Sequence, residues 1–268
     1  MSIGVVSIMP MNPALNLLRC DRKSLEAGLT QNTRAIFVVQ PNNPTGHVLS
    51  KDDASHLVNI AEEKGLALVV DEVFADYLHG DSRSLSGACG ELVESVEGPL
   101  VFTLNGLSKM LGLPQLKLAW IHVDGPSTSS GTSLKSKAKA HLEWICDAYL
   151  SVNTASQTAC PELLKRRLEF QTPIRERLET NLSTLRELAK TTSQIEPLWP
   201  QGGWCIPIRC KGVKDDEAFA LELLEKHGVL IHPGYFFDFE EEDVVVLSLL
   251  PEPKVFREGV TCLLPSGK

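Results

Sequence analysis

The sequence predicts an α/β protein, in which a large domain built on a mostly parallel β-sheet is followed by a small C-terminal α+β domain. Three nearly continuous apolar runs, at residues 35–39, 66–70 and 99–104, support the first half of this prediction. Strands of a parallel sheet are covered on both faces, so they read as unbroken apolar runs. Beyond residue 190 shorter apolar runs alternate with helical patterns, which favours a small mixed domain.

Composition narrows the class of protein. The chain has 268 residues, of which 43% are hydrophobic and 22% are charged, so it can bury a sizeable core. The net charge of -8 and the pI near 5.4 argue against nucleic acid as the main partner, because a phosphate backbone requires a basic face. No apolar stretch has the length of a membrane span, so no membrane is expected as a partner. The seven cysteines form no Cys-x-x-Cys pair, which indicates neither a metal site nor a disulfide framework and favours a reducing cytoplasm.

The first half of the chain has the element order of a parallel sheet. The predicted elements are a helix at 22–29 and strands at 35–39, 66–70, 99–104 and 116–123. Ser50, with Asp53 three residues later, resembles a capping box, and it predicts a helix that ends at Gly65. A strand–helix–strand unit of this kind forms a right-handed crossover in a parallel sheet.

The second half of the chain is richer in helical patterns. The predicted elements are helices at 134–148, about 161–190 and 215–227, strands at 204–209, 229–232 and 244–249, and a last helix from Pro253. Pro173 lies inside the longest helix and is expected to kink it. The predicted boundaries are 1–150 for the large domain, 151–190 for the connecting helix and 191–268 for the small domain.

Polar side chains stand just beyond the three long apolar runs. Asn43 follows the first run, Asp71 the second, and the pair Ser108 and Lys109 the third. The carboxyl ends of parallel strands meet at one edge of the sheet, where open α/β sheets bind their ligands. A lysine amine can form a Schiff base with a carbonyl compound and can then move a proton. An amide, a carboxylate and a lysine so placed would surround an aldehyde-bearing pyridine cofactor.

The same segments resemble the class I/II aminotransferases, which are fold-type I pyridoxal-phosphate enzymes. The resemblance rests on Asn-Asn-Pro-Thr-Gly at 42–46, on Asp71 after a buried strand, and on Ser108 and Lys109 followed by Gly-Leu-Pro at 112–114. It implies pyridoxal 5'-phosphate as the cofactor. It also implies that Ser108 and Lys109 lie in the cofactor site, with Lys109 as the Schiff-base residue and general base.

The resemblance implies roles for three further residues. Asp71 would pair with the pyridine nitrogen and keep it protonated, so that the ring accepts electron density from the substrate. Asn43 would donate a hydrogen bond to the phenolic oxygen of the ring. Lys117 stands where the family usually has an arginine on the cofactor phosphate; a lysine keeps the charge and loses the two-pronged geometry.

Three departures from the family pattern modify this expectation. Phe74 stands where the family usually has a tyrosine that contacts the phenolic oxygen, although Tyr77 is close in sequence. Val246 stands where the family usually has an arginine for the substrate carboxylate. The family's N-terminal arm, its Gly/Ser phosphate loop and its ring-stacking aromatic residue have no counterpart in this sequence. We therefore expect an N-terminally truncated member of the family with impaired activity.

The expected reaction transfers an amino group between an amino acid and a 2-oxo acid. The resemblance further implies a homodimer. A C–S lyase or a decarboxylase is an alternative, because the motifs indicate the cofactor and not the bond that is broken. A second alternative is a catalytically inactive remnant that serves as the partner of a full-length relative.

Overall fold

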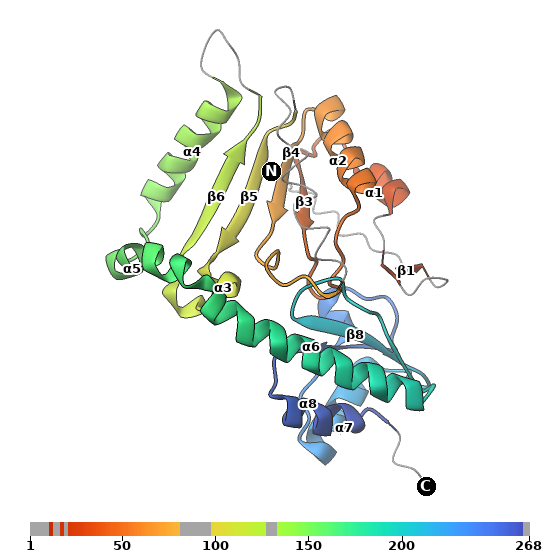
Figure 1. The fold of residues 1–268 in the computed structure, drawn as a ribbon. Coiled ribbons are helices and arrows are strands. Elements are labelled where there is room, and N and C mark those ends of the chain that lie inside the picture. The colour runs from red at the N-terminus through yellow and green to blue at the C-terminus, as the bar shows by residue number, and fades with distance from the viewer. Residues whose placement is uncertain (1–10, 13–16, 19–20, 81–97, 127–132, 265–268) are drawn as a thin grey trace.

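A four-stranded sheet with the order β3-β4-β5-β6 forms the centre of the large domain in the computed structural model (Figure 1). Its strands are β3 (Ala35–Val39), β4 (Ala67–Asp71), β5 (Val101–Gly106) and β6 (Ala119–Asp124). The first three strands are parallel, as predicted, whereas β6 is antiparallel to β5. The structure describes residues 11–12, 17–18, 21–80, 98–126 and 133–264.

Two helices, α1 (Arg22–Gly28) and α2 (Lys51–Lys64), lie beside β3 and β4 (Figure 1). Ser50 is the N-cap, as predicted, because its Oγ accepts a hydrogen bond from the Asp53 N–H at 3.0 Å. The helix ends at Gly65, whose φ of 62° is a left-handed conformation that glycine adopts without a steric penalty. The buried side chains of this core include Leu25, Ile36, Leu57, Ile60, Leu68 and Val70.

The helix α4 (Leu134–Ala148) has the predicted bounds but buries none of its side chains. It lies along β6, on the side of the sheet away from α1 and α2 (Figure 1). Its apolar side chains include three that are exposed: Leu134 is 51% exposed, Trp144 is 81% exposed and Ile145 is 53% exposed.

The long helix predicted at 161–190 is wrong in its extent, because two helices occupy this region. They are α5 (Thr154–Lys165) and α6 (Arg167–Thr191). Arg166 separates them: its φ and ψ of -96° and 11° leave the helical region, and its N–H bonds to the Leu163 carbonyl, three residues back. Helix α6 then runs from the large sheet to the small domain (Figure 1).

The small domain is built on a second four-stranded sheet, with the order β7-β8-β10-β9 and antiparallel neighbours throughout. Its elements are β7 (Ile195–Pro197), β8 (Cys205–Cys210), α7 (Asp216–His227), β9 (His232–Pro233), β10 (Val244–Ser248) and α8 (Pro253–Thr261). The α+β character is as predicted, although the strand expected at 229–232 is reduced to β9. Its core includes Leu178, Leu182 and Leu185 from α6, so that helix belongs to the packing of the small domain.

The segment that enters the small domain is bonded to the loop after β3. The carbonyl of Gly46 accepts hydrogen bonds from the N–H groups of Gln201 and Gly202, both at 3.0 Å. Phe74 and Tyr77, from the turn after β4, are buried in the core of the small domain. These contacts join the two sheets at the carboxyl ends of β3 and β4.

The remaining elements are short. They are β1 (Met11–Asn12), β2 (Leu17–Leu18), α3 (Leu107–Met110) and two 3-10 turns, η2 (Pro114–Leu116) and η3 (Gly234–Phe237). Among the helices that the structure describes, none combines the length and the apolar character that crossing a membrane requires.

Candidate active site

Asp71 and Lys109 lie at the carboxyl ends of neighbouring strands. Asp71 is the last residue of β4, and its register partner in β5 is Leu104. The chain leaves β5 at Gly106 and turns at once into α3, which carries Ser108 and Lys109. Because neighbouring strands are only about 4.8 Å apart, the carboxylate and the lysine stand at one edge of the sheet.

The carboxylate of Asp71 is held by its own turn. Its Oδ1 accepts a hydrogen bond from the Val73 N–H at 3.0 Å, and among the described residues it forms no ion pair. The Asp71 carbonyl accepts a hydrogen bond from the Gln40 N–H at 2.9 Å, which ties the end of β3 to the end of β4. The side chain is half-buried and keeps acceptor capacity for a ligand N–H group.

Glu72 is a second carboxyl group at this edge, and the sequence analysis did not single it out. Burial raises the pKa of Glu72; the neighbouring Asp71 raises it further, and a hydrogen bond with the Gln40 side chain lowers it. The Glu72 carbonyl accepts a hydrogen bond from Asn105 Nδ2 at 3.2 Å, which joins the turn after β4 to the end of β5. The sequence shows the acidic Glu72 beside Asp71, but it does not show that Glu72 is buried.

The amine of Lys109 lies beside two aromatic rings. Its Nζ is 5.5 Å from the ring centroid of Phe74 and 5.3 Å from that of Trp204. Burial raises the pKa of the Cys205 thiol, and the positive charge of Lys109 partly opposes this shift. The sequence does not show that Trp204 lies near Lys109, because it comes from a distant segment of the chain.

Tyr77 supports the backbone of α3. Its hydroxyl donates to the carbonyl of Lys109 at 2.8 Å, and its side chain is fully buried. Burial raises the pKa of Tyr77 well above the ordinary value for a tyrosine. The proton of this hydroxyl is therefore committed to the backbone of α3.

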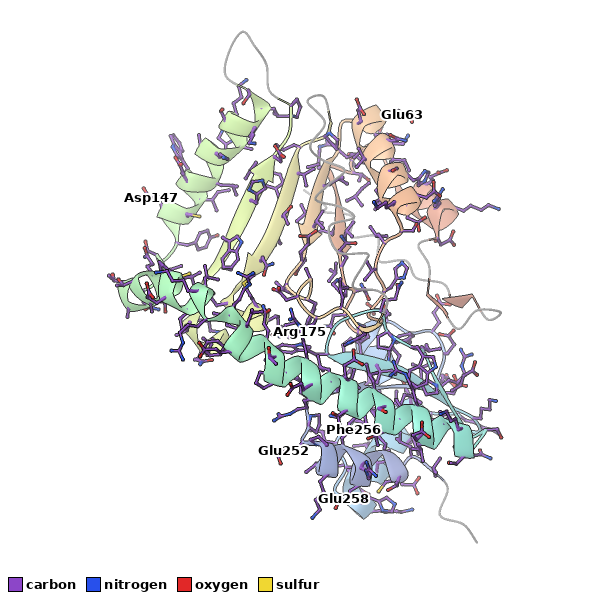
Figure 2. The ribbon with its side chains drawn as sticks, in the orientation of Figure 1. Glu63, Asp147, Arg175, Glu252, Phe256 and Glu258 are labelled. Atoms are coloured by element: carbon purple, nitrogen blue, oxygen red, sulfur yellow. The ribbon has the colours of Figure 1, made fainter. Side chains whose placement is uncertain are left out.

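Helix α6 holds α3 from the other side. Gln171 donates from Nε2 to the carbonyl of Met110 at 3.1 Å. Arg175, which is labelled on α6 in Figure 2, donates to Gln171 Oε1 and to the Asp76 carbonyl, both at 3.0 Å. The short helix that carries Lys109 is therefore fixed by side chains of two other segments.

Three other residues from the sequence prediction make fewer contacts. Asn43 is exposed in the loop after β3, and Lys117 is exposed at the end of η2, where its φ is 50°. Neither side chain forms a hydrogen bond or an ion pair within the described part of the chain. Ser108 is half-buried on α3.

Val246 occupies a buried position in the middle of β10. It is 1% exposed, and its register partners are Pro207 in β8 and His232 in β9. Its neighbours Val245 and Leu247 belong to the small-domain core, so alternation along the strand turns Val246 to the opposite face. No cation stands at this position.

Two comparisons with known sequences identify the family. The sequence model of the family described as "Aminotransferase class I and II" matches residues 2–248. The glutamate-pyruvate aminotransferase AlaA of Escherichia coli (strain K12) is 27% identical over 241 residues, covering 86% of this chain and 56% of that protein. Nicotianamine aminotransferase 1 of Oryza sativa subsp. japonica is 26% identical over 226 residues, covering 80% of this chain and 43% of that protein. The chain therefore spans about half the length of these relatives.

Solved structures share the fold. The alanine aminotransferase from Pyrococcus furiosus aligns with a TM-score of 0.76 and 22% identity, covering 90% of this chain and 59% of that one. A double mutant of the aspartate aminotransferase from Thermus thermophilus aligns with a TM-score of 0.74 and 24% identity, covering 97% and 64%. The order of elements, and the carboxylate and lysine at one sheet edge, agree with the matching sequence model. The chain belongs to the aminotransferase class I and II family of pyridoxal-phosphate-dependent enzymes.

Proposed function

We propose that the chain uses pyridoxal 5'-phosphate to transfer an amino group between an amino acid and a 2-oxo acid. The observation that supports this best is the position of Asp71 and Lys109 at the carboxyl ends of adjacent parallel strands. A carboxylate and an amine at one sheet edge match the two ends of a pyridine aldehyde, one with a basic ring nitrogen and one with a carbonyl carbon.

The groups at this edge fit the cofactor in their chemistry. Lys109 would bond to the aldehyde carbon, Asp71 would pair with the ring nitrogen, and Asn43 and Ser108 would donate to its oxygens. Lys117 would supply a positive charge for the phosphate. When bound, the cofactor supplies an electron sink that lets the substrate carbon release a proton.

The side chains of this protein would hold and move that proton. Lys109, once displaced from the carbonyl carbon by the substrate amine, carries a free amine that can take a proton and return it. Tyr77 and Gln171 fix the backbone of α3 through its carbonyl groups, so the amine would act from one place. The pair formed by Asp71 and the ring nitrogen would keep the ring charged throughout.

We further propose that cofactor affinity is low. Lys117 is exposed and offers a point charge in place of an arginine fork, and Phe74 offers no hydroxyl. Each missing hydrogen bond to a charged group removes about 1.5–3 kcal/mol. Val246 leaves the substrate carboxylate without its usual partner, so a high KM for common amino acids is expected. A homodimer, which the family resemblance implies, and a cytoplasmic location, which the cysteine pattern favours, belong to the same proposal.

Borohydride trapping tests the central assignment. The purified chain is mixed with pyridoxal 5'-phosphate, reduced with borohydride and mapped by peptide mass spectrometry. We expect the label on Lys109 and its loss in Lys109→Ala, with Lys117→Ala as a control that keeps the label at reduced occupancy. A label that falls mainly on another lysine would refute the assignment.

Spectra of the half-reaction with a panel of amino acids then separate the possible reactions. Conversion of the cofactor to its amine form, with release of a 2-oxo acid, supports transamination. Release of sulfide or carbon dioxide in its place would identify a C–S lyase or a decarboxylase. A chain that binds no cofactor at millimolar concentration would be the inactive remnant.

A further inference from the structure

The Lys109 amine lies beside two aromatic rings that pack against each other. The ring centroids of Phe74 and Trp204 are 5.5 Å and 5.3 Å from Nζ, and we call these two residues the aromatic pair. The faces of aromatic rings attract a cation within about 6 Å of the centroid, and tryptophan does so best. Within the described residues Lys109 has no ion pair, so the rings are the groups that hold its charge.

The aromatic pair is packed against Tyr77 as well as within itself. Trp204 packs edge-on against Phe74, with centroids 5.5 Å apart and planes at 72°, and against Tyr77, at 5.0 Å and 68°. The hydroxyl of Tyr77 donates to the Lys109 carbonyl at 2.8 Å. The lysine backbone and the rings beside its amine are therefore one packed unit.

Trp204 is held in this unit without a hydrogen bond from its side chain. Its indole Nε1 is buried and has no acceptor among the described residues. A buried N–H group without an acceptor is unfavourable, so ring packing and the neighbouring cation must offset that cost. The orientation of the ring is thus explained by what its face and edges touch.

We propose that Trp204, together with Phe74, is a positioning residue that holds the Lys109 ammonium beside the two rings until a carbonyl compound attaches to it. Attachment then needs the amine to leave the rings. The ammonium gives a proton to water, and its nitrogen lone pair adds to the carbonyl carbon. The carbonyl oxygen departs as water with the two remaining hydrogens of the nitrogen. A ring face stabilises only the charged reactant, so it slows this step. The inference rests on the proposed role of Lys109.

The rate of attachment tests the proposal. Purified chain is mixed with pyridoxal 5'-phosphate, samples are quenched with borohydride over time, and the labelled fraction of Lys109 is measured by peptide mass spectrometry. In Trp204→Leu we expect the labelling rate to rise about three- to tenfold, because one ring face is lost. In Trp204→Phe, which keeps a ring, we expect a change of about twofold or less.

Matched controls separate positioning from general loosening of the fold. Trp199 lies in the same segment and its ring faces Arg186, at 5.5 Å, so Trp199→Leu should leave Lys109 labelling unchanged. Labelling of Lys254, which is exposed on α8 and lies outside the proposed site, serves as the internal reference. If Trp204→Leu does not fold, Phe74→Leu removes the other ring and should also accelerate labelling.

The outcomes are distinguishable. Labelling of Lys109 that is unchanged or slower in both ring variants overturns the positioning role while leaving the proposed function intact. Equal acceleration in Trp204→Leu and Trp204→Phe overturns it as well, since the ring would then be irrelevant. Absence of labelling at Lys109 in the native chain is the failure of the proposed function itself.

Discussion

Single side chains decide what the sheet edge can bind. The Lys109 amine faces two rings, and the Asp71 carboxylate keeps acceptor capacity beyond its bond to the Val73 N–H. Val246, which the resemblance matches to the family's arginine, is buried in β10. Under the proposed function, the edge therefore carries the reactive groups but not the arginine that the family usually offers to the substrate carboxylate.

Asp71→Asn should separate binding from chemistry. An asparagine Oδ1 can still accept the Val73 N–H bond, so the turn and the stability of the chain should be retained. A neutral amide cannot keep the ring nitrogen protonated, and the half-reaction with an amino acid should slow by orders of magnitude. Stopped-flow spectra measure that rate.

Asp76→Asn is the control for this change, since Asp76 lies in the same turn and uses its backbone carbonyl to bind Arg175. It should leave the half-reaction unchanged. Equal rates in native chain and Asp71→Asn would remove Asp71 from the mechanism.

At the scale of elements, α2 shows how local chemistry sets a boundary. We expect Ser50→Ala to lower the free energy of unfolding by about 1 kcal/mol, because the Asp53 N–H loses its acceptor. Ser55→Ala, in the interior of the same helix, should be neutral or slightly stabilising. The Ser55 hydroxyl only donates a hydrogen bond to the Lys51 carbonyl, one turn back in the helix. Urea denaturation of the two variants checks the pair. A larger loss in Ser55→Ala would contradict the capping argument.

Elements defined by local signals were predictable from sequence. The strands at 35–39 and 66–70 are apolar runs between polar turns, and the Ser50 N-cap and Gly65 bound α2. The helix at 134–148 was predicted to the residue, but its packing was not, because periodicity shows which side chains share a face and not whether another element covers it.

Contacts between distant segments could not be predicted from the sequence. Trp204 meets Lys109 only because the chain returns from the small domain to the ends of β4 and β5. The antiparallel direction of β6 depends on the path after α3 and leaves no local pattern. The break at Arg166 was also missed, because Pro173 was the visible breaker and the actual interruption lies before it.

At the scale of the whole molecule, Gly202 lets the two sheets meet. A Cβ on Gly202 would lie 2.6 Å from Pro41 Cγ and 2.9 Å from the Tyr77 carbonyl oxygen. Gly202→Ala should therefore cost about 1–3 kcal/mol of stability, as overpacking does. In Gly259→Ala the nearest atom, Val229 Cγ1, is 3.8 Å away, so this helical site should be neutral or gain stability. Thermal unfolding compares the stability of the two variants. A Gly202→Ala chain as stable as the native one would contradict the prediction, because the junction would then accommodate the added Cβ at little cost.

The outer face of the large domain should drive self-association. Leu134 and Ile145 lie on one side of α4, about three turns apart, and Trp144 is next to them. These side chains are 51%, 53% and 81% exposed, and Ile121 on the adjacent strand β6 is 46% exposed. Grouped apolar surface of this kind favours burial against another chain, at about 25 cal/mol per Å². Within the described residues β6 also pairs on one side only, which leaves backbone groups for another strand.

We therefore expect sedimentation velocity of the purified chain to show mass that rises with concentration. The double variant Trp144→Glu with Ile145→Lys should weaken this association about tenfold or more, because charges oppose burial. Leu230→Glu is the matched control: Leu230 is 75% exposed but lies in the small domain, between α7 and β9, so its replacement should change nothing. A chain that stays monomeric at all concentrations would contradict the prediction. So would association that is lost in Leu230→Glu and kept in the α4 variant, because the interface would then lie on the small domain.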